Sequence, residues 1–169
     1  RVCADCHGTY GANSTYPEKL VPIDEVRTDR VRLDALTPTH RGAYGKSWFA
    51  HFGELPNIAA PRGYVAPPLD GVWASAPYFH NGSVPTLWHV LHPSQRPTVW
   101  NRTSNDFDQI HLGPTIETAS DLPSTVTTGA QRRQYFDTRS FGKSATGHDF
   151  PNALNEEEKH SVLEYLKTL

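Results

Sequence analysis

The chain has 169 residues, enough for one domain with a hydrophobic core. Its formal net charge is −2, and its lysines and arginines are scattered, which argues against a nucleic-acid partner or an anionic membrane surface. No stretch approaches the length of a transmembrane helix, and no signal peptide is recognisable. Hydrophobic residues make up 37% of the chain, and its 12 glycines and 14 prolines predict a loop-rich fold built around something rigid.

The first residues carry the strongest motif. Cys3, Cys6 and His7 form C-x-x-C-H, the pattern of c-type haem attachment. Two thiols one helical turn apart can form thioethers with the porphyrin vinyl groups, and the imidazole that follows reaches one face of the iron. The alternatives are a redox dithiol, a disulfide or half a zinc site, but a second Cys/His pair at finger spacing is missing. The motif therefore predicts one covalent haem c, which would supply part of the apolar core.

The second axial ligand of this haem is predicted to be a histidine, because the chain contains no methionine. We place His148 first, since it follows a Gly-rich loop just before the last helix, and His92 second. The histidines that come into question are His40, His51, His80, His89, His92, His111, His148 and His160. Two imidazoles would give a six-coordinate, low-potential haem that relays electrons. A five-coordinate haem that binds a gas or a peroxide is the open alternative.

The chain in order predicts few regular elements. An apolar stripe predicts a helix over residues 23–36, ended by Thr37-Pro38. Aromatic residues over 43–53 indicate a second helix, which packs on the porphyrin or in the core. Residues 54–70 read as an extended connection. After a turn at residues 80–83, Ser83 or Thr86 caps a helix that runs to His92.

The remainder is predicted to be irregular until the last helix. Residues 93–151 read as loops, with a short strand or helical turn at 131–136. Asn155 and Glu158 have capping-box spacing, and Val162, Leu163, Leu166 and Leu169 line one face of the final helix. We therefore expect a mainly α fold, a cytochrome c-like helical domain with long irregular loops around one c-type haem.

Two stretches resemble a known family. Residues 76–87 (APYFHNGSVPTL) resemble the signature of the bacterial di-haem cytochrome c peroxidase superfamily. The longer run over 67–88 and the tail over 146–169 are most similar to the branch that contains the secreted di-haem rubber oxygenases. The family fold is a pair of mostly helical cytochrome c domains, each with one haem, and the active site lies in the N-terminal half. The resemblance implies that this chain corresponds to the C-terminal haem domain.

The resemblance also sets the domain expectation. Residues 1–169 carry one haem motif, and the helix that normally precedes C-x-x-C-H has no counterpart before Cys3. We therefore expect a single cytochrome c domain, the C-terminal part of a longer chain. It would be an electron-transfer domain or the non-catalytic half of a di-haem peroxidase or oxygenase, and its partner would be a second haem domain or a redox protein. Because bacteria attach haem covalently outside the cytoplasm, we expect a periplasmic or secreted protein.

The aromatic residues around the signature are further haem candidates. We expect Trp73 and Tyr78 to contact the cofactor, either packing on the porphyrin edge or lining an electron route. The resemblance implies a calcium ion near the signature, held partly by the carbonyl groups of Ser75 and Pro77. No catalytic residue is predicted in this chain.

Overall fold

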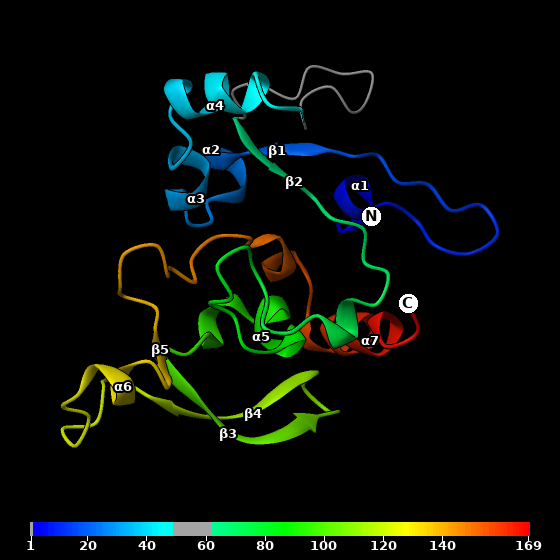
Figure 1. Cartoon of the computed structure of the whole chain (residues 1–169). Helices are drawn as coiled ribbons and strands as arrows, with labels where there is room; N and C mark the ends of the chain where they lie inside the picture. The colour runs from blue at the N-terminus through cyan, green and yellow to red at the C-terminus, as the bar shows by residue number, and fades with distance from the viewer. Residues whose placement is uncertain (1, 49–61) are drawn as a thin grey trace.

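The computed structural model describes residues 2–48 and 62–169 (Figure 1). Among these residues 33% are helical and 19% lie in strands or bridges, and the strands form two antiparallel sheets. The expectation of a mainly α fold is therefore wrong. The difference arises chiefly from a sheet within residues 93–151, which the sequence pattern presents as loops.

The first layer of the molecule combines short helices with a two-stranded sheet (Figure 1). Its elements in chain order are α1 (Ala4–His7), β1 (Leu20–Pro22), α2 (Ile23–Val26), α3 (Val31–Asp34), α4 (Pro38–Gly45) and β2 (Gly63–Val65). The two strands are antiparallel, with Val21 opposite Tyr64. Val21, Val26 and Ala66 are buried together in a small cluster, against which Cys6 packs. This layer therefore has little apolar core of its own.

The helix predicted over residues 23–36 is interrupted. Arg27 ends α2 in a left-handed conformation, with φ +56°. The Asp29 carboxylate then accepts the backbone N–H of Val31 at 2.9 Å, where α3 begins. Thr37 and Pro38 were expected to end a helix, but they begin α4, with Pro38 in its first turn. The aromatic helix predicted at 43–53 overlaps only the end of α4, and its part beyond residue 48 lies outside the described residues.

The second layer holds the larger core. It contains η2 (Val72–Ala74), α5 (Leu87–Leu91), η3 (Pro93–Gln95), η4 (Phe150–Ala153) and α7 (Glu156–Leu166). Thr86 caps α5, and the side chains and backbone of Asn155 and Glu158 form a complete capping box on α7. The predictions of these two helices are confirmed. The core of this layer comprises Tyr78, Val84, Leu87, Leu91, Leu112, Leu163 and Leu166.

A three-stranded antiparallel sheet lies beyond α5 (Figure 1). It is formed by β3 (Val99–Asp108), β4 (Gly113–Ala119) and β5 (Tyr135–Asp137) in the order β4-β3-β5. The short helix α6 (Gly129–Arg132) precedes β5, so the segment predicted as a strand or helical turn contains both. Trp100 and Phe136 stack across β3 and β5 with ring centres 5.2 Å apart. The loop expectation for residues 93–151 is wrong over these strands.

Within the described ranges, none of the helices is both long enough and apolar enough to span a membrane.

Candidate functional site

The helix α1 presents the motif residues on one turn. Cys3 is its N-cap, and Cys6 and His7 lie in its last turn. The helix ends at Gly8, whose φ is +85° and whose N–H donates to the carbonyl of Ala4 at 2.9 Å. A Cβ atom at residue 8 would lie 2.0 Å from the carbonyl oxygen of Thr15. Glycine is therefore required here, and it fixes the end of the helix directly after His7.

Cys3 and Cys6 are not joined to one another by a disulfide. Burial raises the pKa of the Cys3 thiol above its ordinary value. A reactive redox dithiol needs a lowered pKa, because the thiolate is the nucleophile. The environment of Cys3 therefore argues against a redox C-x-x-C.

The ring of His7 is oriented by a backbone acceptor. Its Nδ1 atom lies 2.7 Å from the carbonyl oxygen of Pro67, which can accept only if Nδ1 carries the proton. This tautomer leaves Nε2 with its lone pair, as a metal ligand requires. Tyr10 and Tyr16 hold the same segment in place: the Tyr10 hydroxyl accepts the N–H of Leu69, and the Tyr16 hydroxyl donates to the carbonyl of Ala66 at 2.7 Å.

The loop before α7 carries His148 and lies between the two layers (orange in Figure 1). Gly147 has φ +81°, and a Cβ atom there would lie 2.2 Å from the backbone of Arg27. His148 follows in a left-handed conformation with φ +52°. Its N–H donates to the carbonyl of Val26 at 2.6 Å. The loop is thus pressed against the end of α2, with glycine required where the backbones meet.

The imidazoles of His7 and His148 approach one another edge-on across the two layers. Their ring centres are 6.2 Å apart and their planes are inclined by 66°. A metal ion bound by two imidazoles at about 2 Å separates the ring centres by about 6 Å, once about 1 Å from each nitrogen to its ring centre is added. Edge-to-face contacts between aromatic rings span the same distance range. The Nδ1 atom of His148 is buried without a hydrogen-bond partner among the described residues, which leaves this ring uncommitted.

The surroundings of His148 are aromatic. The rings of Phe79 and Phe150 lie edge-on to it, with centres at 6.0 and 5.4 Å. Burial lowers the pKa of His148 to about 4, and the charges of His7 and Arg96 add to this effect. The ring is therefore neutral at pH 7, and neutral imidazole is the form that binds metals. These residues, with α1 and its thiols, fit a haem held between the layers.

Arg96 surrounds the loop of His148 with hydrogen bonds, and nothing in the sequence pattern predicts this role. Its guanidinium donates to the carbonyl oxygens of Ala145 at 2.8 Å and Gly147 at 2.6 Å, among others. Its carbon Cζ also lies 4.8 Å from the ring centre of Phe79. Burial lowers the pKa of Arg96 to about 10, so it remains a cation at neutral pH. Pro67 is the other contributor that the sequence does not predict, since a backbone acceptor has no side-chain signal.

His92, the second candidate for the distal ligand, has both ring nitrogens occupied. Nδ1 lies 2.8 Å from the carbonyl oxygen of Trp88, and Nε2 lies 3.0 Å from the carboxylate of Glu156. Its ring stacks on that of Trp88 with centres 4.1 Å apart. His92 thus joins α5 to the start of α7.

The other histidines lie elsewhere. His80 stacks on Tyr64, His89 bonds to the Thr86 hydroxyl at 2.7 Å, and His111 bonds to Asp108 at 2.7 Å. His40 is exposed on α4 and His160 is exposed on α7, while His51 lies outside the described residues. His148 is therefore the histidine whose ring faces that of His7 in the described part of the chain.

Two aromatic residues that we expected at the cofactor have separate environments. Tyr78 is buried in the core of the second layer, and its hydroxyl donates to the carbonyl of Val72 at 2.8 Å. This burial raises the pKa of Tyr78. Trp73 lies on η2 and is 42% exposed. Neither residue has a ring contact with His7 or His148 among those that the described structure contains.

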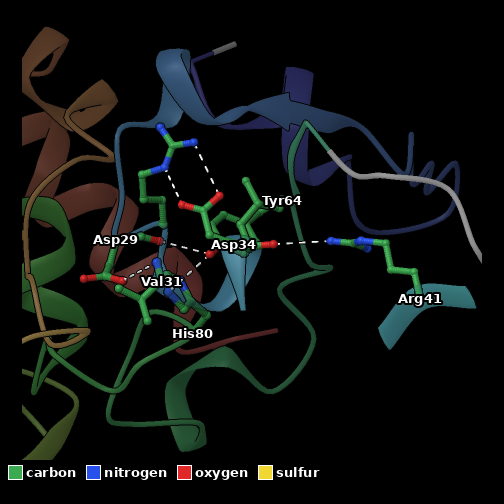
Figure 2. A network of polar contacts seen from close by, with 8 residues as sticks. Asp29, Val31, Asp34, Arg41, Tyr64 and His80 are labelled. Carbon is green, nitrogen blue, oxygen red and sulfur yellow. Dashed lines mark hydrogen bonds and ion pairs between the residues drawn. The ribbon is translucent and has the colours of Figure 1, made fainter. Parts of the chain in front are cut away.

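A polar network joins the first layer to the signature turn, the turn at residues 80–83 within the signature (Figure 2). The Tyr64 hydroxyl donates to the carbonyl of Asp29 at 3.0 Å and lies 3.4 Å from Nε2 of His80. The Asp29 carboxylate accepts the N–H of Ser144 at 3.3 Å. Asn81 donates to the carbonyl of Ser144 at 2.9 Å. These contacts fix residues 142–144, just before the loop of His148.

Over residues 2–48 and 62–169, no group of three or more His, Cys, Asp or Glu side chains could hold a metal ion. The calcium ion expected at the carbonyls of Ser75 and Pro77 stays a prediction.

Comparison with known proteins agrees with the class that the motif indicates. Residues 63–101 match the family described as RoxA-like, cytochrome c-like. The matched segment runs from β2 through the signature turn and α5 into β3. Residues 63–101 are therefore similar to a RoxA-like, cytochrome c-like domain, and such a domain implies a haem c cofactor and iron binding.

Two proteins of Sinorhizobium fredii (strain NBRC 101917 / NGR234) are similar to the chain. Uncharacterized protein y4iM is 42% identical over 90 residues, which cover 53% of this chain and 20% of that protein. Uncharacterized protein y4iJ is 37% identical over 122 residues, which cover 66% of this chain and 19% of that protein. The chain thus spans about a fifth of the length of these relatives.

Proposed function

We propose that this chain is an electron-transfer domain that holds one haem c through Cys3, Cys6 and His7, with His148 as the second axial ligand. The observation that carries the proposal is the close approach of the two imidazoles, with ring centres 6.2 Å apart. The cytochrome c-like family match supports the haem and the electron-transfer role. A haem held in this way supplies one-electron redox chemistry.

The chain's residues define what the site does with that chemistry. His7 is held in the Nδ1–H tautomer by Pro67, so its Nε2 points a lone pair away from the backbone. His148 offers a neutral ring from the opposite side. With His7 and His148 holding a haem from its two faces, the site would pass electrons and would leave no open position for peroxide or oxygen. Imidazole in place of a thioether favours the ferric state and gives a potential below that of His/Met cytochromes.

His148 is a better second ligand than His92. Both ring nitrogens of His92 are engaged, one by the Trp88 carbonyl and one by Glu156. Withdrawing His92 would leave these contacts unsatisfied and would unstack it from Trp88. The buried Nδ1 of His148 has no such partner in the described structure.

We also propose a setting for this domain. The chain spans about a fifth of the similar proteins, and its family match is RoxA-like. Both observations support a domain within a larger oxidoreductase of the di-haem peroxidase or oxygenase kind. Its partner is then a second haem domain or a redox protein, and its location is the periplasm or the exterior of the cell, where covalent haem proteins mature.

The test is spectroscopic and uses the haem-loaded full chain. We expect low-spin spectra in both oxidation states and slow CO binding to the ferrous form. His148→Ala should give a high-spin ferrous haem that binds CO rapidly. His160→Ala, at an exposed position on α7, is the matched control and should leave the spectra unchanged.

Two results would contradict the proposal. A wild-type protein that is high-spin and binds CO fast would support the five-coordinate alternative. A low-spin His148→Ala protein whose spectrum changes in His92→Gln would move the axial role to His92.

A further inference from the structure

We propose that Arg96 is the positioning residue for His148, holding the distal imidazole in reach of the haem iron through the 145–148 backbone and the ring of Phe79. This inference rests on the proposed function, since it assigns the group that keeps the second ligand in place. It concerns a residue that lies 52 positions away from His148 along the chain.

The guanidinium of Arg96 uses all five of its N–H donors on backbone carbonyls. Nε donates to His89 at 3.1 Å. One terminal nitrogen donates to Ala145 at 2.8 Å and Gly147 at 2.6 Å. The other donates to Val90 at 3.3 Å and to His148 itself at 3.4 Å. Three of the five acceptors thus belong to the loop that carries the ligand, and two belong to α5.

This arrangement requires arginine. Its five donors are fixed in one planar fork, whereas lysine has three donors on a single rotating nitrogen. No carboxylate forms an ion pair with Arg96 within residues 2–48 and 62–169. The N–H groups of the cation therefore donate to neutral carbonyls, and each of these hydrogen bonds is charge-assisted. The contacts tie the loop to the rigid helix α5.

A second contact runs through Phe79. The guanidinium carbon lies 4.8 Å from the centre of this ring. The same ring lies edge-on to His148 at 6.0 Å. Phe79 therefore contacts both the cation and the imidazole, and it packs against one side of the His148 ring.

His148 needs such support because its own anchors are few. Its backbone is left-handed, a conformation that non-glycine residues adopt at a cost. Its N–H bond to Val26 holds the main chain, but its buried Nδ1 has no partner among the described residues to orient the ring. Metal-ligating histidines are usually oriented by a partner on the second nitrogen. Here the loop geometry and Phe79 take over that task.

The test compares Arg96→Lys and Arg96→Gln in the haem-loaded full chain. Replacing the fork should let His148 detach, so the rate of CO binding to the ferrous haem should rise by about 10–100-fold, the usual range for losing an orienting group. A high-spin ferrous band should appear in parallel. Added imidazole should restore the low-spin spectrum, because it replaces the detached ligand and repairs nothing else.

Two controls separate positioning from general structure. Arg30→Gln removes an exposed ion pair to Asp34 within the first layer, away from the loop of His148, and should leave CO binding unchanged. In a His148→Gly background, Arg96→Lys should add no further change in CO binding, because the two residues act in series. Far-UV circular dichroism establishes that each variant is folded.

The outcomes distinguish the inference from the proposed function. If His148→Gly gives a high-spin haem but folded Arg96→Lys and Arg96→Gln bind CO at the wild-type rate, the inference about Arg96 is wrong and the proposed function stands. If His148→Gly had no effect on the spectrum, the proposed function itself would fail. Should neither Arg96 variant fold, Phe79→Leu keeps all five hydrogen bonds and removes the ring that contacts both Arg96 and His148. An unchanged CO rate in that variant would also overturn the inference.

Discussion

At the scale of single residues, the histidines of this chain differ in what their ring nitrogens contact. His92 and His111 are tied to carboxylates, and His89 is tied to a hydroxyl. The Nδ1 atom of His7 bonds to the carbonyl of Pro67, which leaves Nε2 available as a ligand. His148 is buried among aromatic rings with an unpartnered Nδ1 in the described structure. The pattern of occupied nitrogens, rather than the number of histidines, selects the pair suited to a metal.

His89 should make the protein sensitive to mild acid. Burial lowers its pKa to about 4 in the folded state, and the charges of His111, His92 and Arg96 add to the effect. In the unfolded chain its pKa is about 6.5, so between these values the unfolded state binds a proton that the folded state does not. The stability contributed by neutral His89 is complete above about pH 6.5 and is lost as the pH falls towards 4.

The expected loss from His89 is about 1–2 kcal/mol, after allowing for screening by solvent. The measurement is the urea midpoint of the holoprotein at pH 7 and pH 5. His89→Gln should lose less stability between these two values than the wild type, whereas His160→Gln, exposed on α7, should behave as the wild type. Equal acid losses in wild type and His89→Gln would show that other groups carry the effect.

Some of the residues at the site can be read from sequence and others cannot. C-x-x-C-H is a local pattern whose spacing follows from the two covalent bonds to haem, so Cys3, Cys6 and His7 could be predicted. The absence of methionine restricted the second ligand to histidine, and the position of His148 before α7 favoured it. The role of Arg96 could not be predicted, because nothing about a single arginine before a proline indicates that three of its acceptors lie about 50 residues later.

At the scale of elements, α7 depends on its first turn. The Asn155 side chain accepts the N–H of Glu158 at 2.9 Å, and the Glu158 carboxylate accepts the N–H of Asn155 at 2.8 Å. Glu156 in the same turn accepts from Lys159 at 2.8 Å and also contacts His92. Leu163 and Leu166 then enter the core of the second layer. The cap therefore fixes both the start of the helix and its contact with α5.

Asn155→Ala should destabilise the protein by about 1 kcal/mol, the usual value of a side-chain N-cap. The Glu158 N–H would lose its acceptor, while the core face of the helix would be unchanged. Urea unfolding of the holoprotein measures the difference. Ser161→Ala is the matched control on the same helix, since its exposed hydroxyl donates to the carbonyl of Glu157 on that helix, and its effect should stay within about 0.5 kcal/mol. Equal losses in the two variants would argue against the cap.

The helices with local signals were predictable, and the sheet was not. Capping residues and an apolar face identify α7 because both lie within the helix itself. In β3 only Val99 and Trp100 are buried, and the strand is mostly exposed after them. A strand of this kind has no alternating pattern, because its far half packs on little. The division between α2 and α3 was equally hidden, since it follows from the left-handed conformation of Arg27.

At the scale of the whole molecule, the two layers have separate cores. The small cluster of Val21, Val26 and Ala66 shares no residue with the larger core around Leu87 and Leu163. Hydrogen bonds join the layers, such as the bond from His148 to Val26 and the bond from Ser144 to Asp29, and Phe150 packs against the small cluster. His7 and His148 face one another across this junction. A covalent haem held by both would give the layers a common apolar surface.

Removal of the haem should therefore unfold the first layer before the second. In a Cys3→Ala, Cys6→Ala protein, both thioether bonds are lost. The four buried apolar side chains of the layer, Val21, Val26, Leu33 and Ala66, are too few to stabilise short helices, which are marginal without tertiary packing. Hydrogen–deuterium exchange should show rapid exchange over residues 2–48, while α5 and α7 keep their protection because their own core is intact. Cys3→Ala alone is the control, since one thioether and His7 remain, and it should keep intermediate protection over residues 2–48. Unchanged protection there in the double variant would mean that the layer is stable without the cofactor, and the haem would then be bound by a preformed fold instead of completing it.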